Sequence, residues 1–576
     1  MRFASSYVRT VHFVAILLAS LSSQVCGQGE DNASISPPDR VSQPKPDFPV
    51  TGTDSPPPEF RLPSASALVP GGKKLASGLL INVVRFEIVG ATAFAPHILD
   101  EQAAPFLNRP IGSEELEALR LGLTRLYIDA GYLNSGAIIP DQEVREGVVV
   151  IRIIEGTLNE IVVSGEHRFD ASFVRERLLR GAGRPLHVGT LQESMQLMLQ
   201  NPQIVRMNAE LAAGGRLGES VLRVAVTEAP RHTLGVSLAN NRSPGVGGVR
   251  TELLGSLRNV LGRGETWSLR FGTSRGLDDQ TLDFAIPVTP ADTQLSFRYD
   301  KNSAAMIEAP FDALDIDSQS RTVEFGLRHP WRHTLRDSLT IGAMISLRES
   351  LTRLGGDPFS FAVGVHDGRS KVTALRLTAE WLDRGSDHVF SARGVLSRGF
   401  DAFNATVNRD GTPDTRFTSA LLQAQWVRRL STSGTQLVLR ADAQTSDTAL
   451  LPLEKFAIGG IDSVRGFREN RLIRDRGWTG GAEIRFPVGR LALPGISTQP
   501  EDGRLSLVLF ADIGQAWDRG GDKERIWGFG PGLRWDIAAD SQAQLYWAGK
   551  RKNIENAGDD LQDRGIHFRL VMRKHF

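Results

Sequence analysis

Short segments in which apolar and polar residues alternate fill the C-terminal part of this 576-residue chain. About sixteen of them follow one another between Arg231 and Phe576, and a period of two predicts β-strands with one apolar and one polar face. After the N-terminus no run of about twenty apolar residues occurs, so we expect no membrane-spanning helix. If the protein lies in a membrane, it must therefore span it as a closed barrel, in which all backbone groups are paired.

The last segment shows the alternation best. One face carries Ile566, Phe568, Leu570 and Met572, and the other carries His567, Arg569 and Arg573. This is the lipid-out and lumen-in pattern of a bacterial barrel strand. Connections between segments alternate between tight turns and long loops, which is also typical of such barrels. A soluble β-propeller would supply many strands, but not this alternation of connections.

The N-terminus resembles a secretory signal. Basic Arg2 and Arg9 precede an apolar run, Val11–Leu21, that is too short to span a bilayer. We predict a signal peptide over residues 1–27. Cys26 is the only cysteine, so a lipoprotein remains an alternative; otherwise the mature chain has neither disulfides nor thiolate metal sites. Residues 28–78 are rich in proline and predict an extended periplasmic linker, and their pattern does not indicate an amphipathic helix.

Two units of α+β pattern follow, over residues 79–156 and 157–229. In the first, a strand at Val83–Val89 precedes a helix that Ser113 caps and that Gly131 ends. In the second, a helix at Leu191–Leu199 is expected to open with the capping box Thr190…Glu193. Residues 230–576 then form the barrel, so the predicted fold is two small α+β domains followed by an all-β barrel of about sixteen antiparallel strands.

The composition limits the possible functions. The formal net charge is +1, from 67 basic and 66 acidic residues, which argues against nucleic acid as a partner. No nucleophile elbow, zinc-protease motif or Walker loop is present, so the sequence predicts no enzyme, no cofactor and no metal site.

One long connection, residues 447–477, carries the sequence Val464-Arg465-Gly466-Phe467. Loops of this length inside a compact domain are usually functional. A second pattern lies on the second strand after this loop, Arg504–Gly514, where Phe510, Asp512 and Gly514 share the face opposite to the leucines. Asp512 should therefore point into the lumen.

These motifs resemble those of the outer-membrane polypeptide-transporter superfamily, whose members carry V-R-G-F/Y in a loop that folds back into the barrel. Gly131-Tyr132, Pro140-Asp141-Gln142 and Glu155-Gly156 look like the first polypeptide-transport-associated (POTRA) domain of two-partner secretion transporters, and Leu199-Gln200-Asn201-Pro202 looks like the second. The resemblance covers residue 80 to the C-terminus and points to the haemolysin-activator branch.

The resemblance implies roles for particular residues. Arg465 is expected to pair with Asp512 and clamp the loop to the barrel wall, with Val464, Gly466 and Phe467 shaping the loop tip and Phe510 and Gly514 the wall. Glu483 is a second candidate carboxylate; its alternative is an ordinary lumen-lining charge. The terminal Phe576 resembles the signal that the barrel-assembly machinery reads during biogenesis.

The implied function is an outer-membrane pore of a Gram-negative cell. Its periplasmic POTRA domains would bind an unfolded exoprotein, resembling an adhesin or a haemolysin, and the barrel, embedded in outer-membrane lipid, would secrete it. Two alternatives stay open: an assembly or insertase factor for outer-membrane proteins, and a passive porin. A porin needs no periplasmic domains, so residues 81–228 argue against that alternative.

Overall fold

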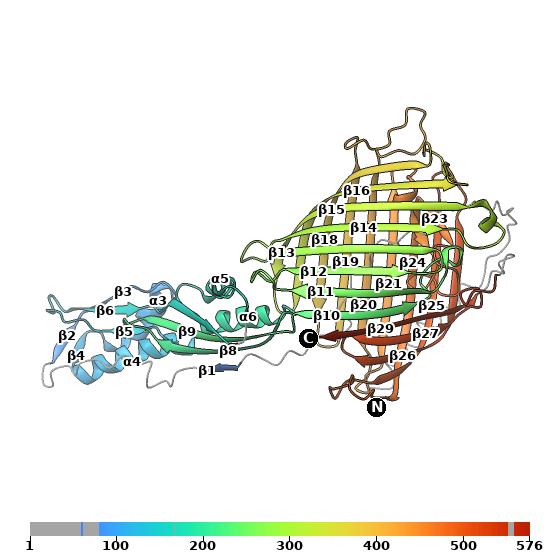
Figure 1. The fold of residues 1–576 in the computed structure, drawn as a ribbon. Coiled ribbons are helices and arrows are strands. Elements are labelled where there is room, and N and C mark those ends of the chain that lie inside the picture. The colour runs from blue at the N-terminus through green and yellow to red at the C-terminus, as the bar shows by residue number, and fades with distance from the viewer. Residues whose placement is uncertain (1–58, 62–79, 166–167, 551–557) are drawn as a thin grey trace. The chain divides into compact units, whose positions relative to one another are not determined.

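A computed structural model describes residues 59–61, 80–165, 168–550 and 558–576. These residues form two small α+β domains and a large β-barrel (Figure 1). The expected signal peptide, its cleavage site and most of the proline-rich linker lie outside the described residues. Among the described residues, no helix is long and apolar enough to cross a membrane.

The first domain is built on a three-stranded sheet in the order β3-β6-β5, with β3 parallel to β6, and on a separate pair, β2 with β4. Leu119 and Leu123 of the long helix pack in one core with Ile151 of the sheet, and all three side chains are fully buried. Its elements are β2 (Ile81–Val83), β3 (Arg85–Val89), α3 (Pro96–Ala103), the 3-10 turn η1 (Ala104–Phe106), β4 (Arg109–Ile111), α4 (Ser113–Asp129), β5 (Gly136–Ile138) and β6 (Val148–Ile154).

Two details of this domain differ from the sequence prediction. The strand expected at Val83–Val89 is interrupted, because the N–H groups of Val84 and Arg85 both donate to the carbonyl of Gly147, at 2.8 and 3.3 Å. The α4 helix begins one residue earlier than expected, since Gly112 is its N-cap residue and the Glu115 carboxylate accepts from the Gly112 N–H at 2.9 Å.

The second domain packs two helices on a sheet in the order β1-β8-β9-β7, in which β1 covers Glu59–Arg61. Helix α5 (Ala171–Ala182) and strand β8 (Ile204–Ala213) were not predicted from the sequence. The predicted capping box is also wrong: α6 begins at Val188, and Nδ1 of the N-cap residue His187 accepts from the Thr190 N–H at 3.3 Å. The elements are β7 (Thr157–Ser164), α5 (Ala171–Ala182), α6 (Val188–Leu199), β8 (Ile204–Ala213) and β9 (Glu219–Glu228).

Strand β1 (Glu59–Arg61) lies within the segment that was expected to be only a linker. It pairs with β8 in parallel, with Glu59 opposite Asn208 and Arg61 opposite Glu210. The outer edge of β8 therefore accepts an extended segment of chain through backbone hydrogen bonds.

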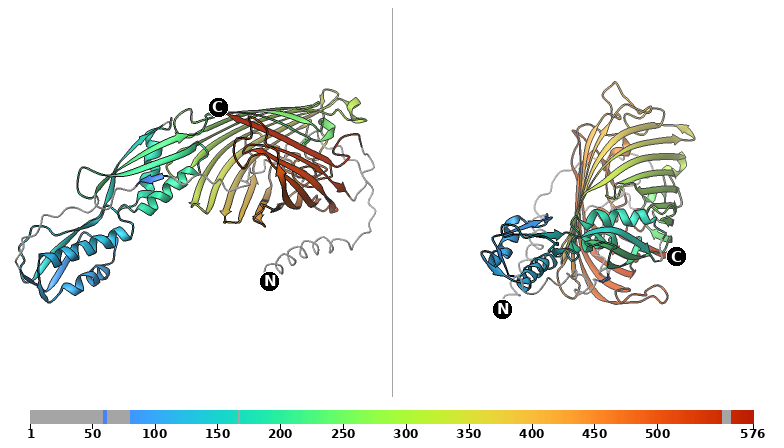
Figure 2. Two further views of the ribbon diagram at one scale, coloured as in Figure 1. Left: turned by 90° about the horizontal axis from the view of Figure 1, so that it is seen from below. Right: turned by 90° about the vertical axis from the view of Figure 1, so that its left-hand side faces the viewer.

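The barrel is closed and has sixteen main antiparallel strands, which confirms the predicted fold class (Figures 1 and 2). The first strand, β10, pairs with the last, β29, from Thr233 opposite His575 to Ala239 opposite Arg569. The strands are β10 (His232–Ala239), β11 (Arg250–Arg258), β12 (Thr266–Thr273), β13 (Leu277–Pro287), β14 (Gln294–Ala305), β15 (Ile316–His333), β16 (Asp337–Leu354), β18 (Arg369–Arg384), β19 (His388–Gly399), β20 (Thr418–Arg429), β21 (Gln436–Ser446), β24 (Arg476–Arg490), β25 (Arg504–Trp517), β26 (Glu524–Ala538), β27 (Ser541–Trp547) and β29 (Ile566–His575), with the two-residue pieces β17 (Asp357–Pro358) and β28 (Gly549–Lys550).

Side chains alternate between the outer and inner surfaces of this wall. On β25, Leu507 and Leu509 are 42% and 49% exposed on the outer surface, whereas Phe510 and Asp512 are buried. The terminal Phe576 exchanges two backbone hydrogen bonds with His232, of 2.9 and 3.2 Å, at the seam where the barrel closes. Inward residues of β24, β25 and β29 are thus among those that can meet the long loop.

Candidate functional site

The connection between β21 and β24 covers residues 447–475, two fewer than predicted, because β24 begins at Arg476. Its middle forms a small antiparallel hairpin, β22 (Phe456–Ile458) with β23 (Leu472–Arg474). The tip of the loop lies beyond this hairpin. Apolar residues of hairpin and tip form a buried cluster with two wall residues, one from β25 and one from β26: Phe456, Ile458, Val464, Phe467, Leu472, Ala516 and Ile526.

Arg465 at the tip is 1% exposed and bonds to the wall through three nitrogen atoms of its side chain. Nε lies 2.7 Å from Oδ2 of Asp512, and Nη2 lies 2.9 Å from Oδ1. The backbone N–H of Arg465 donates to the same carboxylate at 3.2 Å. A planar guanidinium and a carboxylate match in this bidentate geometry, which a lysine could not reproduce.

Glu483 of β24 is a third member of the site. Its Oε2 accepts from Nη1 of Arg465 at 2.7 Å, and its Oε1 accepts from Nε of Arg485 at 2.6 Å. Arg440 of β21 lies farther off, with Nη2 3.9 Å from Asp512 and 4.0 Å from Glu483. Glu483 therefore contacts the loop itself. Arg485 and Arg440 were not identified from sequence, although Arg485 shares the inward face of β24 with Glu483.

Aromatic rings complete the pocket for Arg465. Its guanidinium carbon lies 3.7 Å from the ring centre of Phe510 and 4.7 Å from that of Tyr546. The two rings meet edge to face at 5.5 Å. The π-face of an aromatic ring attracts a desolvated cation, so Phe510 does more than line the wall. Tyr546 was missed, because no motif marks it.

The remaining motif residues shape the contact between loop and wall. Val464 and Phe467 are 0% and 1% exposed and anchor the apolar side of the tip. Gly466 has φ of +97°, and a Cβ there would lie 3.0 Å from the Ala548 Cβ. A Cβ on Gly514 would lie 2.8 Å from Ile458 and 3.0 Å from Val464. The glycine on β25 thus leaves room for the apolar residues of the loop.

The tip also contacts β29, which the sequence did not predict. Oδ2 of Asp462 accepts from Nη2 of Arg569 at 2.6 Å. The N–H of Gly466 donates to Nε2 of His567 at 2.9 Å, and His567 is fully buried. Sequence alternation places His567 and Arg569 on the inward face of the last strand, but not opposite the loop. The tip therefore bridges β24 and β25 to the strand that closes the barrel.

Beyond the tip, Arg468 reaches the connections at the long-loop end of the barrel. It forms ion pairs with Asp563 at 2.6 Å and with Glu308 at 2.9 Å. Glu308 lies in the connection between β14 and β15, and Asp563 in the connection before β29. One arginine thus links the folded-back loop to two other connections.

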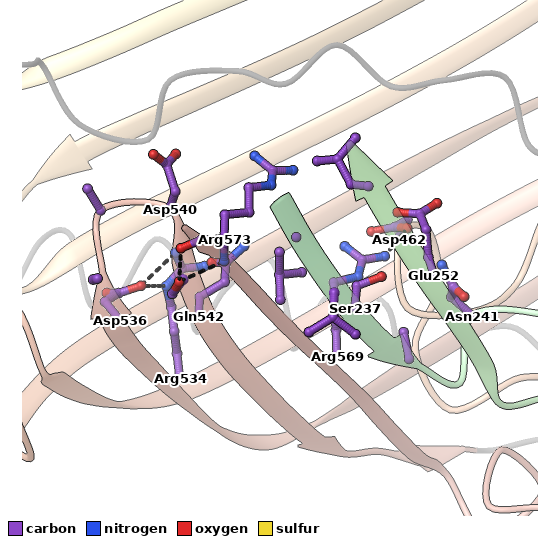
Figure 3. A pocket seen from close by; sticks show the side chains of 18 of the residues that line it. Ser237, Asn241, Glu252, Asp462, Arg534, Asp536, Asp540, Gln542, Arg569 and Arg573 are labelled. Atoms are coloured by element: carbon purple, nitrogen blue, oxygen red, sulfur yellow. Dashed lines mark hydrogen bonds and ion pairs between the residues drawn. The ribbon is translucent and has the colours of Figure 1, made fainter. Parts of the chain in front are cut away.

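A polar cavity of about 1070 Å³ lies inside the barrel (Figure 3). It reaches from Asp540 and Ser541, in and beside a tight turn, to Asp462 at the tip of the loop. The arginines and carboxylates that line it include Arg534, Arg569 and Arg573 on one part of the wall and Glu252, Asp279 and Asp283 on another, and every cationic lining residue is an arginine. The loop tip thus forms one boundary of a highly charged, hydrophilic lumen.

Two protein-family models match the chain. The model of the haemolysin secretion/activation proteins ShlB/FhaC/HecB matches residues 218–535, more than half of the chain. The model of the ShlB-type POTRA domain matches residues 81–156, the first α+β domain.

Individual relatives agree with these matches. The outer membrane transporter CdiB of Dickeya dadantii strain 3937 is 24% identical over 450 residues, which cover 75% of this chain and 76% of the relative. The heme/hemopexin transporter protein HuxB of Haemophilus influenzae strain 86-028NP is 23% identical and covers 66% of this chain and 68% of its own length. The solved structure of CdiB from Escherichia coli has the same fold, with a TM-score of 0.64, 19% identity, and coverage of 88% of this chain and 93% of that one. The chain belongs to the haemolysin secretion/activation family ShlB/FhaC/HecB and is a two-partner secretion transporter of the outer membrane.

Proposed function

We propose that the structure is the resting state of a secretion pore, in which loop 447–475 closes the lumen and Arg465 clamps it shut. The observation that carries this proposal is the buried set of bonds from Arg465 to Asp512 and Glu483, at the end of the lumen cavity where Asp462 is part of the lining. An extended polypeptide that crosses this cavity from the end at Asp540 meets the loop tip at the other end.

The chemistry of the clamp suits a closure that can open. Two charges taken out of water are stabilised by each other only while their geometry holds. The adjoining cavity is lined by charged side chains, which can solvate both partners once they separate. Displacement of the tip therefore exchanges the polar contacts of the clamp for contacts with the charged lumen, and it also separates the apolar contacts of Val464 and Phe467 with the wall.

On this proposal, the two periplasmic domains, residues 79–156 and 157–229, recognise the exported partner. Residues 230–576 form the pore. Both domains have sheet edges, and an edge strand can pair with an extended peptide through main-chain hydrogen bonds. Strand β1 already occupies the edge of β8 in this way. The partner is then an exoprotein resembling an adhesin or haemolysin, bound unfolded. The chain moves polypeptide and catalyses no reaction.

Deletion of the gene, followed by complementation, tests this function. A single large exoprotein should disappear from the cell surface and the medium, while the other outer-membrane barrels keep their abundance. A general loss of outer-membrane barrels would instead support the assembly or insertase alternative. Unchanged export together with reduced uptake of small solutes would support a passive porin. Complementation with Phe576→Ser separates biogenesis from transport, because that variant should fail at insertion into the membrane.

A further inference from the structure

The loop that carries the Arg465 clamp has a second buried charge at its root. Glu454 ends a short 3-10 turn, η4 (Pro452–Glu454), just before the hairpin β22–β23. Its side chain is 1% exposed. The sequence motifs of the site do not include it, and the clamp at the tip does not contact it.

Two arginines from the barrel wall hold this carboxylate. Nη2 of Arg376 donates to both carboxylate oxygens, at 2.8 and 3.0 Å. Nη1 of Arg348 donates to Oε1 of Glu454 at 3.3 Å and to the carbonyl of Leu453 at 3.1 Å. The backbone is held as well, because Nε2 of Gln444 donates to the Glu454 carbonyl at 2.9 Å.

The two arginines are themselves fixed in the wall. Nη1 of Arg376 donates to Ser397 at 2.9 Å, and Arg348 lies 3.5 Å from Glu324. Removing one partner from such a buried network leaves an unpaired charge, which costs more free energy than the network contributes as a whole. Next to it, the loop residues Leu450 and Leu451 are buried in a cluster with Val372, Ala374 and Phe417. The root therefore has a polar and an apolar attachment.

Root and tip attach to different sides of the strand from which the loop leaves. In the sheet, β21 is followed on one side by β20, β19 and β18, and on the other by β24 and β25. Glu454 bonds to β16 and β18, whereas Arg465 bonds to β24 and β25. The charges are also reversed: at the root an acid of the loop meets bases of the wall, and at the tip a base of the loop meets acids.

We propose that Glu454 is a positioning residue for secretion: it keeps the root of the loop attached while the tip is released, so the loop opens by swinging about its root. This rests on the proposed function, because it specifies how the same loop moves. Since the root stays bonded, the Arg465 side chain remains within reach of its site and can return after the partner has passed.

Two matched pairs of cysteines test this in the full-length transporter. The root pair is Leu451→Cys with Val372→Cys, and the tip pair is Ile461→Cys with Ala548→Cys. Each pair joins one loop residue to one wall residue of the same buried apolar cluster. In cells, a short bis-methanethiosulfonate linker cross-links the two cysteines of each pair, and a reductant removes the cross-link. The cross-linked fraction is measured from the shifted band on a denaturing gel. Cys26 is the only native cysteine.

The root tie should leave secretion of the partner within about twofold of the reduced protein, whereas the tip tie should lower it at least tenfold, reversibly. If both ties block secretion, the whole loop must leave and the root is no pivot. If the tip tie has no effect, loop displacement is not required, and the proposed gating itself fails. In the untied protein, Glu454→Gln should lengthen channel openings in planar bilayers, because the tip returns more slowly, and Glu349→Gln, at a more exposed ion pair on β16, should not. Equal effects of these two substitutions would contradict the proposed role of Glu454 in positioning the root of the loop.

Discussion

The Arg465 guanidinium and the Asp512 carboxylate meet edge to edge, with Nε 2.7 Å from Oδ2 and Nη2 2.9 Å from Oδ1. The third guanidinium nitrogen binds Glu483 at 2.7 Å, so the pair is one side of a triad. Arg465 thus has two carboxylate partners in this triad, so losing Arg465 and losing Asp512 have different consequences. Loss of Arg465 leaves two carboxylates close together, whereas loss of Asp512 leaves the arginine with one partner.

Arg465→Ala should therefore impair closure more than Asp512→Ala. Removing one partner of a fully buried pair costs about 3–5 kcal/mol. Even about 2 kcal/mol would change the ratio of attached to detached loop about thirtyfold. We expect the double variant to be no worse than Arg465→Ala alone, because removing Asp512 relieves the repulsion from Glu483. Open probability in planar bilayers and secretion of the partner are the two measurements.

The matched control for this cycle is the ion pair of Arg270 with Asp283, at 2.8 Å, which lies on β12 and β13 and lines the same lumen. Arg270→Ala should leave the open probability unchanged. If the Arg465 and Asp512 defects multiply, or if the control behaves like them, the clamp is no special contact.

Gly466→Ala should loosen the tip for two reasons. A residue with a side chain at φ of +97° is strained by about 1–2 kcal/mol, and the new Cβ lies 3.0 Å from the Ala548 Cβ. Gly520 has φ of +78°, and a Cβ at that position would have no other atom within 4 Å, so Gly520→Ala is a control that introduces backbone strain without crowding, in the turn between β25 and β26. Adding Ala548→Gly to Gly466→Ala should restore part of the closure, measured as open probability. No rescue would show that crowding at Ala548 does not matter.

The strands and the inward position of Asp512 could be predicted because alternation depends only on local sequence. The contacts of the tip with β29 could not. Asp462 meets Arg569, and Gly466 meets His567, only because barrel closure places the last strand beside the folded-back loop. The contacts of Glu454 could not be predicted for a similar reason, because its partners are distant in sequence and belong to other strands. Resemblance pointed to Arg465 and Asp512, but a motif does not identify partners such as Tyr546 that lie outside it.

The errors in the two α+β domains have a local cause. Thr190 and Glu193 fit the pattern of a capping box, yet His187 supplies the N-cap acceptor and the helix begins earlier. Several residues near a helix start can serve as cap, and the sequence does not rank them. The division of the first strand depends on the carbonyl of Gly147, which a hydrophobic pattern does not include.

Glu155 in the first domain predicts a pH dependence of stability. Burial alone would raise the pKa of this carboxyl, but hydrogen bonds from Thr92, Ala93 and Tyr127 hold the pKa below its ordinary value of 4.5. Glu155→Gln should therefore destabilise the domain by about 1–3 kcal/mol at neutral pH. Because the folded-state pKa is lowered, the difference should be complete above the ordinary value and be lost as the pH falls through the folded-state pKa.

Thermal unfolding of residues 80–228, which contain both hydrophobic cores, measures this effect. Glu143→Gln is the control, because its side chain is 82% exposed and its ion pair with Arg145 lies at the surface. A constant difference between wild type and Glu155→Gln from pH 7 to pH 3 would contradict the assigned role.

The edge of β8 offers the last prediction, which concerns how the partner is recognised. Because β1 pairs in parallel with β8, any partner strand that uses this edge must displace it. Phe60→Pro removes the backbone N–H at the centre of β1 and weakens this pairing. The affinity of residues 59–228 for the unfolded secretion domain of the partner should then rise, while Asn208→Pro within β8 should abolish binding. Circular dichroism on both variants checks that the domain stays folded, and calorimetric titration measures the affinity. An unchanged affinity in Phe60→Pro would assign recognition to another edge, and tight binding of the folded partner alone would rule out strand addition altogether.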